Sequence, residues 1–170
     1  MKEKVAVVTG ASSGIGRATA LLFAKNGAHV VAVGRIQSEL GSLRDDARQA
    51  DGTVRTHLVD ITEVSQVDRL MIETIEHFGK IDVLVNSAGI IKNGSIEDTT
   101  LDDWDKMMNV NLRSMFYLMQ KCVPFLVESK GNIVNVSSVT GMRAFPNVLA
   151  YCVSKAATDQ LTRCTALELA

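Results

Sequence analysis

The chain has 170 residues, of which 46% are hydrophobic and 22% charged, and its net charge is −1. This composition is typical of one compact globular domain, and a balanced charge without a basic stripe argues against nucleic acid or an anionic membrane as a partner. The apolar run at the N-terminus stops at Gly10, which is too early for a signal peptide or a membrane span. Three cysteines without CxxC spacing and three scattered histidines indicate neither a disulfide framework nor a metal site. We therefore expect a soluble cytoplasmic protein.

Five short runs rich in valine and isoleucine alternate with segments of helix length. The runs lie at residues 4–10, 29–35, 53–60, 81–89 and 131–138. Apolar residues recur at helical spacing in Arg17–Asn26, Ser38–Gln49, Glu63–Phe78 and Leu101–Val127. Strands that are apolar on both faces and separated by helices predict a parallel sheet with helices on both sides. Because the connections between parallel strands are right-handed crossovers, such a sheet forms a doubly wound α/β domain of the Rossmann type. Pro124, inside the last helical segment, predicts a kink or break there.

A glycine-rich stretch, TGASSGIG at residues 9–16, joins the first strand to the first helix. Gly10 permits a tight turn, Gly14 lets a phosphate approach the backbone, and Gly16 lets the helix pack against the sheet. Ser12 or Ser13 can cap this helix, whose first N–H groups favour an anion. The pattern predicts a dinucleotide site that includes Gly10, Ser12, Ser13, Gly14, Ile15 and Gly16. A plain strand–turn–helix unit is the alternative.

The second strand ends in Gly34 and Arg35, without the acidic residue that binds the ribose 2′-hydroxyl of NAD in such folds. An arginine fork suits a 2′-phosphate instead. We therefore favour NADP(H) as the cofactor, with NAD(H) as the alternative. A solvated surface arginine is the other interpretation of Arg35.

Near the end of the chain, YCVSK places a tyrosine and a lysine four positions apart, at Tyr151 and Lys155. On a helix these two side chains lie on the same face, one above the other. The lysine charge then favours the phenolate and lowers the pKa of the phenol towards neutrality, as acid–base catalysis requires. Taken alone, the motif is better explained by a surface helix with a chance Tyr/Lys pair, because short motifs often match by accident.

In this order, TGASSGIG, NSAG at Asn86–Gly89, Asn111, Ser138 and YCVSK resemble the short-chain dehydrogenase/reductase family, and the resemblance covers the whole chain. It implies that Tyr151 is the general acid for ketone reduction and the base for alcohol oxidation. Lys155 would lower the pKa of the tyrosine and hydrogen-bond the nicotinamide ribose. Ser138 would hold the substrate oxygen, and Asn111 would hold a water in a proton relay through Lys155.

The resemblance also implies cofactor contacts outside the glycine-rich stretch. Asp60, with Ile61 beside it, would contact the adenine; the alternative for Asp60 is a turn or cap residue before the next helix. For Ser138 the alternative is a strand-end turn residue, and its neighbour Ser137 is interpreted as structural. The turn after the fourth strand would contribute Asn86, Ala88 and Gly89.

The family's fold implies the strand order 3-2-1-4-5 in a single NAD(P)-binding domain over residues 1–170, with two more strands in relatives. We expect an NADP(H)-dependent oxidoreductase, similar to 3-oxoacyl-carrier-protein reductases and to carbonyl or sugar reductases, that interconverts a ketone and a secondary alcohol. Its partners would be a small-molecule carbonyl or alcohol substrate and further copies of itself in a homo-oligomer, a dimer or tetramer. The alternatives are a dinucleotide-binding module or fragment without turnover, and an isomerase or dehydratase on the same scaffold. Without the two further strands, we expect a fragment whose fifth strand is an open edge.

Overall fold

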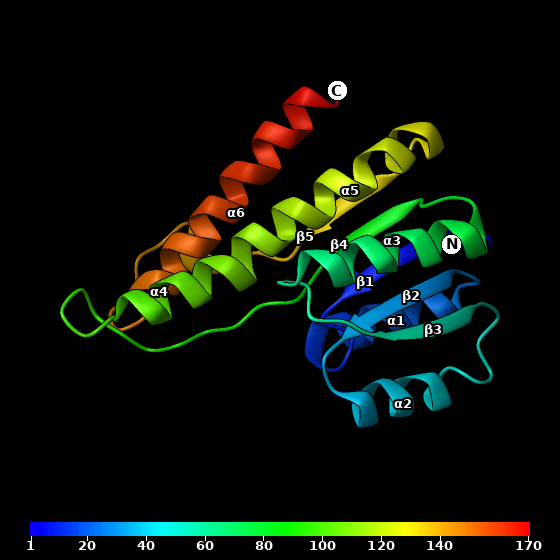
Figure 1. Ribbon diagram of the computed structural model, residues 1–170, viewed down its shortest axis with the longest axis horizontal. Coiled ribbons are helices and arrows are strands. Elements are labelled where there is room, and N and C mark those ends of the chain that lie inside the picture. Colours follow the sequence, from blue (N-terminus) through cyan, green and yellow to red (C-terminus); the bar gives the residue numbers. More distant parts are fainter.

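The computed structural model describes residues 1–170 and contains one parallel sheet with the strand order β3-β2-β1-β4-β5 (Figure 1). The strands are β1 (Val5–Thr9), β2 (His29–Gly34), β3 (Thr53–Leu58), β4 (Val83–Asn86) and β5 (Asn132–Asn135). The helices are α1 (Gly14–Lys25), α2 (Gln37–Asp46), α3 (Val64–Phe78), α4 (Leu101–Met108), α5 (Ser114–Ser129) and α6 (Leu149–Glu168). The predicted Rossmann-type fold and its strand order are confirmed. None of these helices is both long and apolar enough to cross a membrane.

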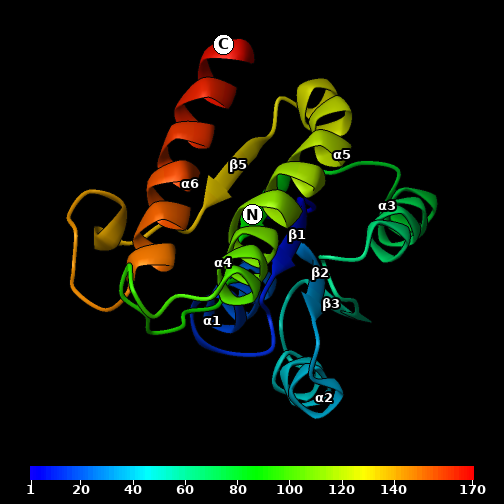
Figure 2. The same cartoon turned by 60° about the vertical axis from the view of Figure 1, so that its left-hand side comes forward.

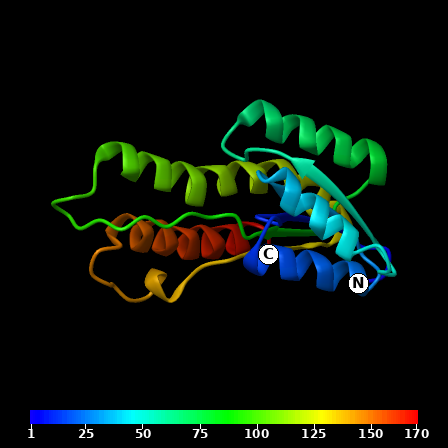
Figure 3. The same ribbon diagram turned by 90° about the horizontal axis from the view of Figure 1, so that it is seen from below.

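Each face of the sheet carries its own apolar core. On one face α3 and α5 cover buried side chains that include Val7, Val31, Leu70, Leu84 and Leu118. On the other face α1 and α2 cover a second set that includes Val8, Val30, Ala20, Leu40 and Leu43. Figure 3 shows α1 and α3 on opposite sides of the sheet. Because side chains alternate along a strand, Val7 and Val8 of β1 belong to different cores, which explains why the central strands have apolar residues at consecutive positions.

The two edge strands differ from the central ones in burial. All five residues of β1 are buried, whereas every residue of β3 and β5 is exposed or only partly buried. Figure 2 shows β5 at the end of the sheet between α5 and α6. β5 pairs with β4 on one side only, and Val134 is 45% exposed. Within residues 1–170, β5 is therefore an edge strand of the sheet.

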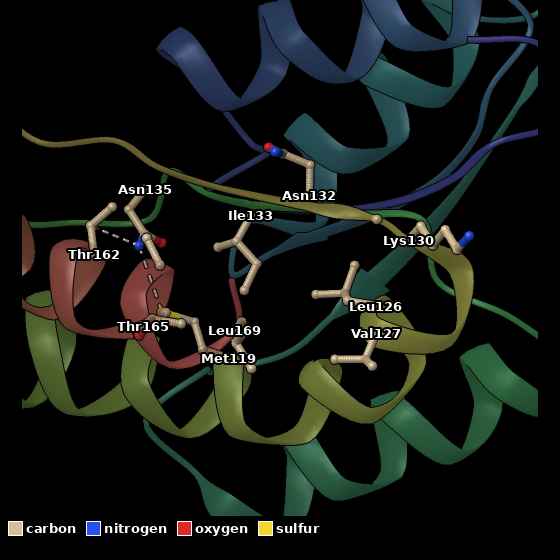
Figure 4. A pocket seen from close by; sticks show the side chains of 12 residues that line it. Met119, Leu126, Val127, Lys130, Asn132, Ile133, Asn135, Thr162, Thr165 and Leu169 are labelled. Atoms are coloured by element: carbon tan, nitrogen blue, oxygen red, sulfur yellow. Dashed lines mark hydrogen bonds between the residues drawn. The ribbon is translucent and has the colours of Figure 1, made fainter.

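A hollow of about 480 Å³ lies beside β5 (Figure 4). The end of α5 and the last turns of α6 form its walls. The amide of Asn135 donates to Thr162 Oγ1 at 2.9 Å and so ties β5 to α6 across one end of the hollow. Its apolar lining comprises Met119, Leu126, Val127, Ile133, Ala166 and Leu169.

The interruption in the long helical segment lies elsewhere than predicted. α5 passes through Pro124 without ending, so the break expected at this proline is wrong. Instead, a π-helical turn at Asn109–Arg113 separates α4 from α5. Such turns widen a helix by one residue and re-aim the side chains within it. Asn111 lies inside this turn and is fully buried. The π-helical turn therefore contains one of the residues that the sequence analysis predicts for the site.

A buried carboxylate, Asp82, connects the N-terminal end of β1 to the N-terminal end of β4. It accepts hydrogen bonds from Lys4 Nζ at 2.7 Å and from the N–H of Val5 at 2.9 Å, and it pairs with Lys80 at 3.1 Å. Burial alone would raise the pKa of Asp82, but these three donors outweigh it and hold that pKa below its usual range. Asp82 therefore stabilises the fold only when it is ionised.

We expect Asp82→Asn to lower the free energy of unfolding by about 1.5–3 kcal/mol at neutral pH, because charge-assisted hydrogen bonds are lost. A depressed folded-state pKa contributes stability that is present above the unfolded pKa of about 3.9 and is lost as the pH falls through the folded value. The difference between the two proteins should therefore shrink in acid. Urea unfolding from pH 7 down to pH 3 measures it, with exposed Asp51→Asn as the control. A pH-independent difference would contradict the argument.

Candidate active site

A groove runs along the carboxyl edge of the sheet, where the strand order changes direction between β1 and β4. It consists of two adjoining cavities of about 170 and 310 Å³, which share five lining residues, Gly10, Ser13, Ala88, Gly89 and Ile90. The first cavity extends towards the ends of β2 and β3, and the second extends towards α6. We call the two cavities together the carboxyl-edge groove. In open α/β sheets ligands bind at this edge, at the point where the strand order reverses.

The glycine-rich stretch forms the floor of the carboxyl-edge groove. Gly10 has φ +67°, and a β-carbon there would lie 2.8 Å from the N atom of Ala88. A β-carbon on Gly16 would lie 2.5 Å from the carbonyl oxygen of Gly10, so only glycine allows α1 to begin this close to β1. At Gly14, with φ +53°, no atom lies within 4 Å of a β-carbon position. The open space above Gly14, at a helix start with unpaired N–H groups, suits a diphosphate.

The two serines of this stretch do not cap α1 as predicted. Ser13 occupies the N-cap position, but its side chain makes no capping hydrogen bond. The hydroxyl of Ser12 is buried and has no hydrogen-bond partner, and a β-carbon on Gly34 would collide with it. Buried hydroxyl groups are nearly always hydrogen-bonded. A buried hydroxyl without a partner on the groove wall therefore indicates that a bound polar ligand supplies its hydrogen bond. The residues present therefore fit a dinucleotide.

Arg35 and Asp60 meet at the rim of the groove beyond Gly34. Arg35 is 55% exposed, and its Nη1 lies 3.6 Å from Asp60 Oδ2. Asp60 Oδ1 accepts hydrogen bonds from the N–H and hydroxyl of Thr62 at 3.0 and 2.7 Å. Burial would raise the pKa of Asp60, but the bonds from Thr62 and the charge of Arg35 lower it overall. Asp60 is thus a turn residue that also lines the groove, together with Ile61.

Tyr151 and Lys155 lie in the first turns of α6 and line the other end of the groove. Lys155 Nζ is 5.7 Å from the centroid of the Tyr151 ring and donates a 2.7 Å hydrogen bond to the carbonyl of Val136. Only 5% of Lys155 is exposed. Burial lowers the pKa of this lysine, against the raising effect of the nearby Asp159 carboxylate. Burial also leaves the charge of this ammonium little screened by water.

Asn111 lies just behind the groove wall rather than in it. Its Oδ1 accepts from the N–H of Ile90 at 2.8 Å, and its Nδ2 donates to the carbonyl of Ile90 at 2.9 Å and to Ser154 Oγ at 3.1 Å. A β-carbon on Gly89 would lie 3.3 Å from Asn111 Oδ1 and 3.8 Å from Lys155 Nζ. The structure thus brings Asn111 and Lys155 together under the loop that follows β4.

Two other predicted residues make internal contacts instead of lining the groove. Ser138 accepts a hydrogen bond from the N–H of Thr140 at 3.2 Å, as the turn interpretation predicts. Asn86 is buried and donates to Asn135 Oδ1 at 2.9 Å, which links the ends of β4 and β5. Ser137 does line the groove, and its hydroxyl donates to the carbonyl of Lys155. The substrate role of Ser138 stays a prediction.

Sequence reasoning missed several residues of this region. Ile90 lies in both cavities and holds the Asn111 amide through its backbone. The sequence by itself assigns no role to Ser154, yet this serine is fully buried and contacts Asn111. The available signal was a serine on the inner face of a helix, one residue before the lysine predicted for the site. Its partner 43 residues away could not be read from the chain.

Comparison with known proteins agrees with this geometry. Residues 4–170 match the family described as short chain dehydrogenase. The chain is 39% identical to the 3-oxoacyl-(acyl-carrier-protein) reductase of Thermotoga maritima, covering 100% of this chain and 70% of that protein. It is 42% identical to a 3beta-hydroxysteroid dehydrogenase of Mediterraneibacter gnavus, covering 99% and 61%. The structure of NAD⁺-bound xylitol dehydrogenase superposes with a TM-score of 0.94 at 30% identity, covering 99% and 65%. The chain therefore belongs to the short-chain dehydrogenase family of NAD(P)-dependent oxidoreductases.

Proposed function

We propose that this protein interconverts a ketone and a secondary alcohol with NADP(H), using Tyr151 as the acid and base. The observation that carries the proposal is the position of Tyr151 and the desolvated Lys155 on the wall of the same groove that has the glycine-rich floor. A nucleotide held at that floor extends along the groove towards this pair. A binding module without turnover has no need of a buried ammonium beside a phenol.

The chain's own residues position the reactants and move a proton. Tyr151 donates its phenolic proton to the carbonyl oxygen during reduction and accepts a proton from the alcohol during oxidation. Lys155 stabilises the phenolate that reduction leaves behind. Ser138 orients the substrate oxygen, and Asn111 belongs to the proton path through Lys155. When bound, the nicotinamide supplies or accepts the hydride.

The preference for NADP(H) rests on the end of β2. Gly34 offers no carboxylate to a ribose 2′-hydroxyl, and Arg35 is half-exposed at the rim of the groove. The Asp60 carboxylate at 3.6 Å holds the guanidinium near the groove yet leaves most of it open. A 2′-phosphate would add a second anionic partner to a cation that has only one.

The substrate is a small-molecule carbonyl or alcohol compound, and the two named relatives are a 3-oxoacyl-(acyl-carrier-protein) reductase and a 3beta-hydroxysteroid dehydrogenase. We expect the purified chain to quench or shift NADPH fluorescence and to oxidise NADPH with at least one member of a panel of aliphatic, cyclic and 3-oxoacyl ketones. NADPH binding without any turnover, in either direction and with either cofactor, would favour the dinucleotide-binding module instead.

We also propose a homo-oligomer. An open apolar surface between α5 and α6 supports it, on which Phe116 is 50% exposed and lies near Leu112 and Leu161. Light scattering of the purified chain measures its mass in solution.

A further inference from the structure

A small buried polar cluster lies behind the groove, between the π-helical turn and α6. Ser154 is its centre and has no exposed surface. Its hydroxyl donates to the carbonyl of Tyr151 at 2.8 Å and accepts from Asn111 Nδ2 at 3.1 Å. One hydroxyl therefore connects the backbone of the proposed acid to the side chain of Asn111.

The same Asn111 amide forms hydrogen bonds with both the N–H and the carbonyl of Ile90, in the loop after β4. Three segments far apart in the sequence thus meet at two polar side chains: the loop at Ile90, the π-helical turn and the first turn of α6. The side chains of Asn111 and Ser154 are both fully buried, and so is the hydrogen bond between them. Removing the Ser154 hydroxyl would leave a buried N–H of Asn111 without an acceptor. The free-energy penalty of a buried unpaired donor is larger than the net stabilisation that the hydrogen bond provides.

A second buried hydroxyl on α6 provides a contrast. Thr158, one turn further along, is also fully buried, but its hydroxyl donates to the carbonyl of Ser154 within its own helix. The bond of Thr158 therefore supports the helix alone. Ser154, by contrast, links the helix to Asn111 in the π-helical turn.

We propose that Ser154 is a positioning residue: its hydroxyl locks the first turn of α6, and with it the Tyr151 phenol, onto the Asn111 amide and the loop after β4. The inference that this matters for turnover rests on the proposed function. The positioning itself is a property of the folded chain. Without the lock, the phenol is no longer held at a fixed distance from Lys155 Nζ, and Asn111 is free to turn away from Ile90.

The chain allows a direct test, because it has only two tyrosines. In a Tyr117→Phe background Tyr151 is the single tyrosine, and the NMR signals of its ring can be followed after labelling with ring-13C tyrosine. We expect Ser154→Ala to shift and broaden these signals, because the phenol is no longer held in one position. The matched control, Thr158→Val, should leave the Tyr151 signals unchanged.

Hydrogen exchange of the Ile90 amide gives a second readout that requires neither cofactor nor substrate. Its N–H donates to Asn111 Oδ1, so Ser154→Ala should speed its exchange by about tenfold while Thr158→Val does not. If Ser154→Ala fails to fold, Ser154→Cys keeps the side-chain volume with a weaker hydrogen bond, and it should move both readouts in the same direction by less. Unchanged Tyr151 ring signals and unchanged Ile90 exchange in the folded variant would overturn the proposal, as would equal changes in Thr158→Val.

Turnover separates this inference from the proposed function. If the protein reduces ketones, Ser154→Ala should lower kcat about tenfold with the KM for NADPH unchanged, whereas Thr158→Val retains kcat. A protein without reductase activity would remove the proposed function, and the NMR and exchange measurements would still decide whether Ser154 positions Tyr151.

Discussion

Tyr151→Phe is expected to lower the rate of carbonyl reduction by about 100-fold or more while the affinity for NADPH stays the same. The substitution removes the phenolic proton but keeps the ring, so the wall of the groove retains its shape. General acid catalysis by a positioned side chain contributes about 10²–10⁴-fold, which sets the expected loss. Stopped-flow rates with saturating NADPH and a ketone substrate measure the chemical step, and fluorescence titration measures the affinity.

The control is the other tyrosine. Tyr117 donates to Asp68 at 2.7 Å between α5 and α3, away from the groove. Tyr117→Phe should therefore keep the full rate. If the two phenylalanine variants turn over equally fast, Tyr151 has no part in proton transfer.

Arg35→Asp should weaken NADPH binding by about 1.5–3 kcal/mol, or about 10- to 150-fold, with a much smaller effect on NADH. The change removes the one cation at the rim beside Gly34 and adds a carboxylate that repels a 2′-phosphate. A carboxylate at this position can instead accept a hydrogen bond from a 2′-hydroxyl. Isothermal titration of both cofactors with both proteins gives the four dissociation constants.

Arg44→Asp makes the same charge change on an exposed side chain of α2 whose ion pair is with its neighbour Asp45. It should alter the affinity for NADPH only slightly, since the solvent screens a distant surface charge. If Arg35→Asp and Arg44→Asp change the ratio of NADPH to NADH affinity equally, Arg35 is a surface arginine and the preference for NADP(H) has another origin.

Local patterns accounted for most of the fold. The valine-rich runs became strands within a few residues of their predicted ends, because a strand buried on both faces needs apolar side chains at consecutive positions. The glycines at 10 and 16 were predictable for a similar reason, since no other residue fits their backbone angle or close contact. The pairing of Tyr151 with Lys155 also follows from local geometry, as residues four apart share a helix face.

Packing between distant segments decided the rest. The helix around Pro124 continues, and the interruption falls at Asn109–Arg113 instead. The reason lies in tertiary contacts: Asn111 bonds Ile90 and Ser154, which are 21 and 43 residues away. A helix propensity or a proline rule describes only neighbours in sequence, so neither could locate this turn.

By itself, the sequence determined that this chain forms a doubly wound sheet with a glycine-lined start to its first helix and a Tyr/Lys pair on its last. Those features depend on residue type, spacing and the two backbone periodicities, all of which are local. Only the tertiary structure decided that the Ser12 hydroxyl is left without a partner, that Asp60 binds Arg35, and that Asn111 reaches Tyr151 through Ser154. Each of these depends on which side chains meet across the carboxyl edge of the sheet, and that is set by the packing of all the elements together.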